Sequence, residues 1–160
     1  MKRFVKSTSL LALCALAPAA AVLAQEAQTP EQQADAAVLT RQGLLKVMSM
    51  YMAPVGGMLK NKVPFDAAVV TKSATNIAAL GTMLPDVFVT DTHGKSTVKT
   101  KAQDGIWTEQ ADFKAKADDL VKAATAVQAA AKGGDKEATL KAAGAMGKTC
   151  GACHDKYRQK

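Results

Sequence analysis

The segment DKEATLKAAGAMGKTCGACHDKYR, residues 135–158, carries the pattern that decides the fold. Asp135 is a preferred residue type at a helix N-cap, and the preceding Gly133 and Gly134 suit the end of an earlier helix. Residues suited to a buried face then recur at steps of three and four, the period of one helix face. They are Leu140, Ala143, Gly147, Cys150, His154 and Tyr157. We therefore expect a helix from Asp135 to about Arg158, with its thiols and imidazole on the face turned towards the core.

Three more helices are expected upstream, because the chain is rich in Ala, Lys, Met, Leu and Gln, which favour helix. The first runs from about Pro30 and should kink or end at Pro54 and at the glycines in positions 56 and 57. The second starts at Pro64, a residue suited to a first helical turn, and stops at Pro85. The third ends at the glycine pair that precedes residue 135. Their apolar stripes are Leu45, Met48, Met52 and Val55; Val70, Ala74, Ile77 and Leu84; and Phe113, Ala117, Leu120, Ala124 and Val127.

Residues 89–105 (VTDTHGKSTVKTKAQDG) show no helical stripe and many turn-forming residues, so they are expected to form one long loop. Four helices joined by two short connections and this loop predict an all-α fold, an antiparallel four-helix bundle of up-down-up-down topology. On the last helix, Ala143 and Gly147 are small for a core face. They are expected to leave room for a large group that is not a side chain.

Residues 1–24 have the pattern of a secretory signal peptide: cations at the start, an apolar run, and small residues before a cleavage point after Ala24. The run contains Pro18 and is shorter than a membrane span, so no membrane anchor is expected. Cleavage leaves residues 25–160 as one domain, which we expect in the periplasm. Cleavage also removes Cys14, so the mature chain keeps only the two cysteines of the last helix.

The charge of the chain argues against nucleic acid as a partner. Loss of the three signal-peptide cations lowers the formal net charge from +7 to +4, a modest value that serves solubility. The sequence contains no block of like charges and no basic stretch interleaved with aromatic residues.

Cys150, Cys153 and His154 form a Cys-x-x-Cys-His sequence, the attachment signature of c-type haem. The two thiols add across the haem vinyl groups as thioethers, and the imidazole coordinates the iron. Their spacing of three and four residues brings all three to one side of a helix. A redox Cys-x-x-Cys would open a helix among strands, which are not predicted, and zinc would need further ligands where only His93 remains. The sequence therefore predicts one covalently bound haem c per chain.

A helical exported domain that ends in CGACHDKYR (residues 150–158) resembles the class II cytochromes c, most closely cytochrome c′. Segments TRQGLLKVM (40–48), VPFDAA (63–68) and IWTEQADFKAK (106–116) are similar to the first three helices of that family. Class I cytochromes c instead carry the haem signature near the N-terminus. The resemblance implies a homodimeric haem carrier. An enzyme is not expected, because the sequence shows no distal His or Arg and no second metal cluster that would drive bond cleavage.

The resemblance also identifies the residue that decides what the iron binds. Low-spin members of the family supply a methionine at a place that, counted from Arg41 and Gln42, is Leu45 here. Leucine has no lone pair, so the resemblance implies a five-coordinate, high-spin haem that binds nitric oxide and carbon monoxide but not dioxygen. Such a protein can also transfer electrons, with a redox partner that the sequence does not identify. The alternative is a low-spin, six-coordinate electron carrier, since a shift of one helical turn, about 5 Å, would present Met48 to the iron.

Other side chains are given roles by the resemblance. Phe88 would form a second wall of the distal site, and Arg41 and Gln42 would reach the haem propionates; otherwise they lie on a solvated helix face. Arg158 would lie near the His154 imidazole on the proximal side; otherwise it is a cation favoured by the C-terminal end of the helix dipole. A dimer contact on the first helix would use Val47, Met50 and Tyr51.

Overall fold

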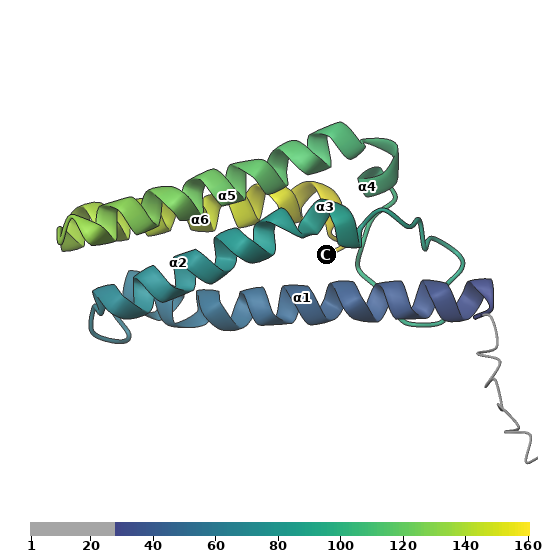
Figure 1. The fold of residues 1–160 in the computed structure, drawn as a ribbon, viewed down its shortest axis with the longest axis horizontal. Helices are drawn as coiled ribbons and strands as arrows, with labels where there is room; N and C mark the ends of the chain where they lie inside the picture. Colours follow the sequence, from purple (N-terminus) through teal and green to yellow (C-terminus); the bar gives the residue numbers. More distant parts are fainter. Residues whose placement is uncertain (1–27) are drawn as a thin grey trace, which may run out of the picture.

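The computed structural model describes residues 28–160, so the predicted signal peptide, residues 1–24, lies outside the described part. The helices are α1 (Pro30–Leu59), α2 (Ala67–Thr82), α3 (Leu84–Val87), α4 (Gly105–Thr108), α5 (Gln110–Lys132) and α6 (Lys136–Tyr157). The long helices α1, α2, α5 and α6 form an antiparallel bundle, which confirms the predicted all-α fold (Figure 1). No helix in this part of the chain is long and apolar enough to cross a membrane.

Helix α1 is longer than the sequence predicts. It begins with a capping box, in which the Thr29 hydroxyl accepts from the Gln32 N–H at 3.2 Å and the Gln32 side chain accepts from the Thr29 N–H at 2.9 Å. Pro54 and the following glycines are predicted to kink or end the helix; an end there is wrong, because the helix continues through them to Leu59. Its last turns contain Val55 and Met58, whose burial in the core offsets the hydrogen bond that proline cannot make.

Helix α2 starts three residues later than predicted. Pro64 lies outside it, and Asp66 is its N-cap, where the carboxylate accepts from the Val69 N–H at 3.0 Å. The predicted stop at Pro85 is also displaced, because α2 ends at Thr82 and Pro85 lies in the first turn of the short helix α3. Proline fits there, since first-turn N–H groups have no partner within the helix.

The junction between α5 and α6 is confirmed to within a residue. Helix α5 ends at Lys132, and the positive φ expected of the glycine pair, 76°, falls on Gly134. Asp135 is the N-cap of α6, where its carboxylate accepts from the N–H groups of Glu137 and Ala138 at 2.8 and 3.0 Å. One carboxylate therefore satisfies two backbone donors that the helix leaves without partners.

The core lies between the four long helices, and within it α5 packs along both α2 and α6. The apolar stripes predicted for the second and third helices are buried along their whole length, and the last residue of the former, Leu84, lies in α3. At Gly81 on α2 the two helices approach so closely that a Cβ atom would lie 2.9 Å from Cγ2 of Val121 on α5. By contrast, α1 and α6 contact each other much less than either contacts its other neighbour.

The long loop, residues 88–104, runs beside the N-terminal half of α1 before it returns to α4 (Figure 1). Asp35 of α1 fixes it: the carboxylate accepts from the Ser96 hydroxyl at 2.6 Å and from the N–H and hydroxyl of Thr97 at 2.8 and 2.7 Å. The bond from Ser96, and then those from Thr97, lower the pKa of Asp35 to about 2. Further along, the loop forms an isolated β-bridge with the residue that follows α6, so it connects α1 to the C-terminal end of α6.

Candidate haem site

A cavity of about 740 Å³ lies between α1, α5, the end of α6 and the long loop. Its volume falls in the range of roughly 300–1,000 Å³ that is typical of small-molecule sites. Cys150, Cys153 and His154 line it, so the predicted attachment residues border a space that can hold a large apolar group. The apolar part of its surface comprises Val38, Leu45, Met48, Met52, Leu84, Phe88, Ala102, Ile106, Phe113, Ala117 and Leu120.

The three attachment residues lie on the last turns of α6. Cys150 and Cys153 are half-buried free thiols. Burial raises the pKa of both thiols, which therefore stay protonated at neutral pH. Burial, and then the charge of Arg158, lower the pKa of His154 and favour the neutral imidazole that ligates a metal. This set fits haem c, because it offers thiols to the vinyl groups and a nitrogen lone pair to the iron.

The small residues of α6 do not leave the space that the sequence predicts. Ala143 is fully buried, and neither it nor Gly147 lines the cavity. A Cβ atom at Gly147 would lie 3.6 Å from Cε of Met52, an ordinary contact distance, so this position faces α1 and not the cavity. The cavity begins further along α6, from Thr149 onwards.

The sequence leaves open which residue of α1 faces the iron, and both candidates lie on the α1 wall of the cavity. Leu45 and Met48 both line it, with 39% and 8% of their surface exposed. Ser49, one turn beyond Leu45, also lines it and was not among the predicted site residues. The helical spacing from Leu45 to Ser49 is the signal that would have identified this hydroxyl.

Arg41 is buried, with 3% of its surface exposed, and does not lie on a solvated helix face. Its Nε donates to the Val87 carbonyl at 2.6 Å, Nη1 donates to the Thr92 hydroxyl at 2.7 Å, and Nη2 donates to the Thr90 carbonyl. All three acceptors are neutral and belong to α3 or the segment that follows it. Burial lowers the pKa of Arg41, while the charge of Asp91 opposes that change. The guanidinium also borders the cavity, where a carboxylate would be its natural partner.

Phe88 lies in the cavity wall, where the sequence places it, and forms an aromatic cluster there. Its ring centroid is 5.0 Å from that of Phe113, which is in turn 5.4 Å from that of Tyr157 in an edge-on arrangement. The Arg41 guanidinium lies 4.9 Å from the centroid of Phe88 and 5.4 Å from that of Trp107. The Trp107 Nε1–H donates to the Phe88 carbonyl at 2.9 Å, which anchors the wall.

Gln42 and Arg158 line the cavity and are exposed. Gln42 donates from Nε2 to the Lys99 carbonyl at 2.8 Å, so its amide holds the long loop. The prediction places Arg158 one helical turn beyond His154, but Arg158 is the C-cap of α6 and has an extended backbone. Its N–H donates to the His154 carbonyl at 3.2 Å, while its side chain borders the cavity.

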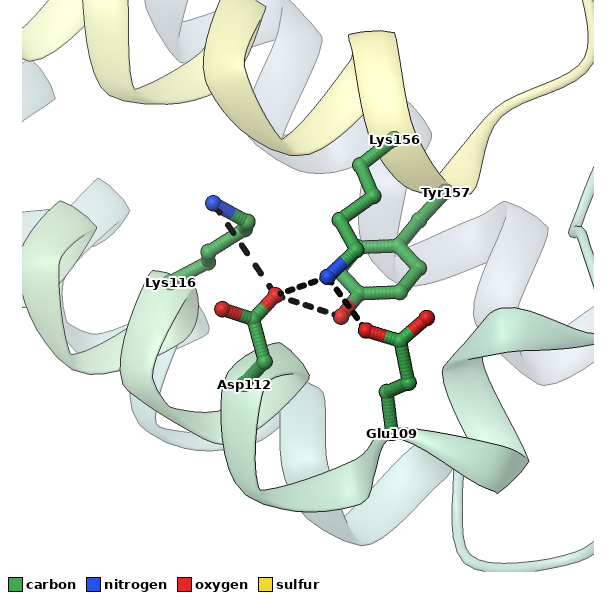
Figure 2. A network of polar contacts seen from close by, with 5 residues as sticks. All are labelled: Glu109, Asp112, Lys116, Lys156 and Tyr157. Atoms are coloured by element: carbon green, nitrogen blue, oxygen red, sulfur yellow. Dashed lines mark hydrogen bonds and ion pairs between the residues drawn. The ribbon is translucent and has the colours of Figure 1, made fainter.

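A polar network fixes the last turn of α6 against the start of α5 (Figure 2). The Tyr157 hydroxyl donates to the Asp112 carboxylate at 2.5 Å. Lys156 donates to the same carboxylate at 3.1 Å and also to Glu109. Lys116 Nζ lies 4.0 Å from the Asp112 carboxylate, and its side chain lines the cavity. The helix turn that carries the imidazole is thereby held to the bundle.

The second histidine and three methionines, Met58, Met83 and Met146, lie away from the cavity. His93 pairs with Asp104 at 3.3 Å within the long loop. Met58 and Met146 are buried in the core, and Met83 is exposed. In the described part of the chain, no cluster of three His, Cys, Asp or Glu side chains could hold a metal ion.

A helical bundle whose last helix presents two free thiols and an imidazole to an apolar cavity defines a c-type haem carrier with C-terminal attachment. The chain belongs to the cytochrome c′ family, whose model matches residues 36–158. It carries covalently bound haem c, as the sequence predicts, and it is a haem carrier rather than an enzyme.

The similarity to known relatives extends over most of the chain. Cytochrome c′ of Cereibacter sphaeroides is 31% identical over 161 residues, which cover 100% of this chain and 99% of that protein. Cytochrome c-554 of the same species is 34% identical over 86% of this chain and 88% of its own. The solved nitric oxide complex of a mutant cytochrome c prime from Alcaligenes xylosoxidans has a TM-score of 0.68 at 29% identity, and the match covers 84% of this chain and 99% of that one.

Proposed function

We propose that this protein is a periplasmic cytochrome with a five-coordinate, high-spin haem that binds nitric oxide and carbon monoxide and transfers electrons. The observation that carries the proposal is Leu45, which lines the cavity on the α1 side and has no atom that can ligate iron. The nitric oxide complex of a related cytochrome c prime supports the choice of ligand.

The apolar wall supports small uncharged gases as ligands. When bound, the haem supplies the iron that coordinates a gas and changes oxidation state. The protein sets polarity and access around it, and these decide which ligands bind. Leu45 and Met48 on α1, together with Phe88, surround the cavity with hydrocarbon and thioether groups. In this proposal the Leu45 side chain is the steric gate, because a gas molecule that enters on the α1 side of the cavity must pass it.

Met48 favours a second candidate, a low-spin six-coordinate electron carrier. Its side chain lines the cavity about one turn from Leu45, and methionine sulfur is an axial ligand of iron in cytochromes c. Against this candidate, Met48 belongs to the buried core cluster, where methionine commonly fills irregular space.

The absorption spectrum of the reduced protein distinguishes the two candidates. A broad Soret band that sharpens and shifts under carbon monoxide would support the five-coordinate haem. Narrow, split bands that the gas leaves unchanged would overturn it in favour of Met48. The variant Met48→Leu provides a check, because only a haem ligated by Met48 would change from low-spin to high-spin.

The gate is tested by the rate of carbon monoxide binding. Leu45→Ala should speed association, because truncation opens the cavity on the α1 side. Ser49→Ala, on the same wall, removes only a hydroxyl and serves as the control for changes in polarity. If Leu45→Ala leaves the association rate unchanged, Leu45 is not the gate.

Dimer formation through α1 is part of the proposal. Leu39, Val47 and Met50 are 56%, 41% and 59% exposed on this helix. Tyr51, by contrast, is partly buried and packs against the core, so it offers less surface to a partner. A double variant with Val47→Glu and Met50→Glu should sediment as a monomer where the parent sediments as a dimer. A dimer that survives both charges would place the contact elsewhere.

Export to the periplasm is supported by the signal-peptide pattern of residues 1–24. Mass spectrometry of protein recovered from a periplasmic extract should give a chain that begins at Gln25 and carries the added mass of haem. A chain that keeps its first residues, or is recovered only from the cytoplasm, would contradict the proposal.

A further inference from the structure

The charged residues around the haem cavity are all of one sign. Those that line it are Arg41, Lys46, Lys99, Lys101, Lys116 and Arg158. No Asp or Glu of the described chain lines the cavity beside them. This arrangement differs from the exposed face of α5, where lysines pair with carboxylates, as Lys114 does with Asp118 at 2.8 Å.

Four of these cations form what we call the cationic rim: Lys46 on α1, Lys99 and Lys101 in the long loop, and Arg158 after α6. All four are exposed, whereas Arg41 is buried and Lys116 lies 4.0 Å from a carboxylate. Within residues 28–160, none of the four has a carboxylate at ion-pair distance. The rim charges are therefore not neutralised by the described part of the chain.

The backbone that carries the rim is fixed rather than loose. Gln42 donates to the Lys99 carbonyl at 2.8 Å, and the Gln159 N–H donates to the Lys101 carbonyl at 2.8 Å. The next residue, Ala102, pairs with Arg158 in the β-bridge. Charges from α1, the loop and the C-terminal end are thus held around one opening, which is the arrangement that concentrates an electrostatic field.

We propose that the cationic rim is the docking surface for a redox partner protein whose cofactor lies among carboxylates. The proposal rests on the electron-transfer role proposed above and names the chemistry of the partner. The partner, a one-electron carrier protein, loses a single electron and this protein gains it, with no atom transferred. Both propionates of a bound haem would leave cations in excess at the mouth, so an acidic face is attracted and a basic face repelled.

A protein partner fits the rim better than a membrane does. Surface-binding segments insert apolar or aromatic side chains between lipid headgroups, next to their basic residues. Between Lys99 and Lys101 the rim offers only Thr100, and the exposed Val47 beside Lys46 belongs to the dimer contact proposed above. The position of the rim at the cofactor's opening suits the small, transient interfaces of electron-transfer complexes.

The test uses the haem-loaded protein and plant-type ferredoxin, an acidic one-electron carrier, as the probe. Reduction of the ferric protein by reduced ferredoxin is followed by stopped flow between low and high ionic strength. The double variant Lys99→Glu with Lys101→Glu should lower the second-order rate at low salt by roughly tenfold or more. The control variant Lys72→Glu with Lys141→Glu changes two exposed lysines outside the cavity wall and alters net charge equally, so it should change the rate far less.

Equal losses in the two variants would overturn the proposal, because net charge alone would then explain them. A parent rate independent of salt would overturn it as well. Binding to phosphatidylglycerol vesicles that is lost only in the rim variant would also overturn it, in favour of a membrane. The carbon monoxide difference spectrum of each variant tests the gas-binding proposal separately from the docking proposal. A spectrum that does not respond to the gas refutes gas binding and leaves the ferredoxin comparison valid.

Discussion

The Tyr157 hydroxyl donates to the Asp112 carboxylate at 2.5 Å and joins the last turn of α6 to the first turn of α5 (Figure 2). The bond is reinforced by Lys156, which donates to the same carboxylate at 3.1 Å. Tyr157, and then Lys156, lower the pKa of Asp112, so the carboxylate stays charged. Since the haem thiols and imidazole lie within the two turns before Tyr157, this contact decides how firmly the attachment helix is held.

Replacement of Tyr157 by Phe should destabilise the protein by roughly 1.5–3 kcal/mol, the usual range for a hydrogen bond to a charged acceptor. The ring and its contact with Phe113 remain, so the loss reports the hydroxyl. Urea unfolding at pH 7 measures it. Lys156→Met, which removes two exposed ion pairs, should cost clearly less, because solvent screens exposed pairs. Equal costs for the two variants would contradict the prediction.

The same hydroxyl should give the stability of the protein an alkaline limit. Burial, and then the bond to Asp112, raise the pKa of Tyr157 from 10.0 to about 12. The unfolded chain therefore loses the phenol proton first, and stability present below pH 10 should fall between about pH 10 and 12. The Tyr157→Phe variant should lack the part of this stability loss that comes from the phenol. Thermal unfolding of both proteins across the same pH window measures the difference.

Asp35 should give the protein an acid limit. Its pKa falls from 3.8 to about 2 in the fold, chiefly through the Ser96 hydroxyl and then Thr97. The stabilisation is present above about pH 4 and is lost as pH falls towards 2, because the unfolded chain takes up the proton first. Asp35→Asn should be less stable at neutral pH and show a shallower decline in this window. Thr97→Val, which removes one of the hydrogen bonds, should lie between the two; an unchanged acid profile in Asp35→Asn would contradict the assignment.

The sequence predicts the fold where the signal is local, and fails where packing between distant segments competes. The five-residue stripe of α5 is buried throughout because helical spacing alone puts those residues on one face. The cap at Asp135 is correct because one side chain suffices to start a helix. Pro54 is the counterexample: a local rule ends the helix there, but the burial of Val55 and Met58 continues it.

The candidate site likewise contains features that local spacing predicts and features that depend on distant segments. The spacing of Cys150, Cys153 and His154 is local, and all three line the cavity. The surroundings of Arg41 are not local, since its three acceptors lie 46, 49 and 51 residues further along the chain. Nor does periodicity reveal that Gly147 faces Met52 rather than a cofactor, because that depends on where α1 lies.

Two glycines should respond oppositely to alanine. A Cβ atom at Gly81 would lie 2.9 Å from Cγ2 of the stiff Val121 side chain, so Gly81→Ala should destabilise by about 1–2 kcal/mol despite its gain in helix propensity. At Gly147 the nearest atom would be Met52 Cε at 3.6 Å, an ordinary contact. Gly147→Ala should therefore stabilise by up to about 1 kcal/mol. Urea unfolding compares them, and a shared sign would show that the helix spacing is not as described.

Arg41 should be among the most costly positions to change in the described chain. Arg41→Met would leave the Val87 and Thr90 carbonyls and the Thr92 hydroxyl without their donor, while a chain of similar length keeps contact with the nearby rings. We expect a loss of roughly 3–5 kcal/mol in the holoprotein, since unpaired buried polar groups each cost about 1–3 kcal/mol. Lys46→Met, an exposed change on the same helix, should stay within about 0.5 kcal/mol.

The destabilisation caused by the loss of Arg41 should be concentrated in one region of the structure. Because the guanidinium holds α3 and the start of the long loop to α1, its removal should speed amide hydrogen exchange in residues 88–98 more than in α5. Arg41→Lys keeps the charge but presents a single point donor in place of the planar fork, so it should restore only part of the protection. Full restoration by lysine would mean that charge alone holds the loop. In that case the guanidinium hydrogen bonds to Val87, Thr90 and Thr92 would not be what orders this side of the cavity.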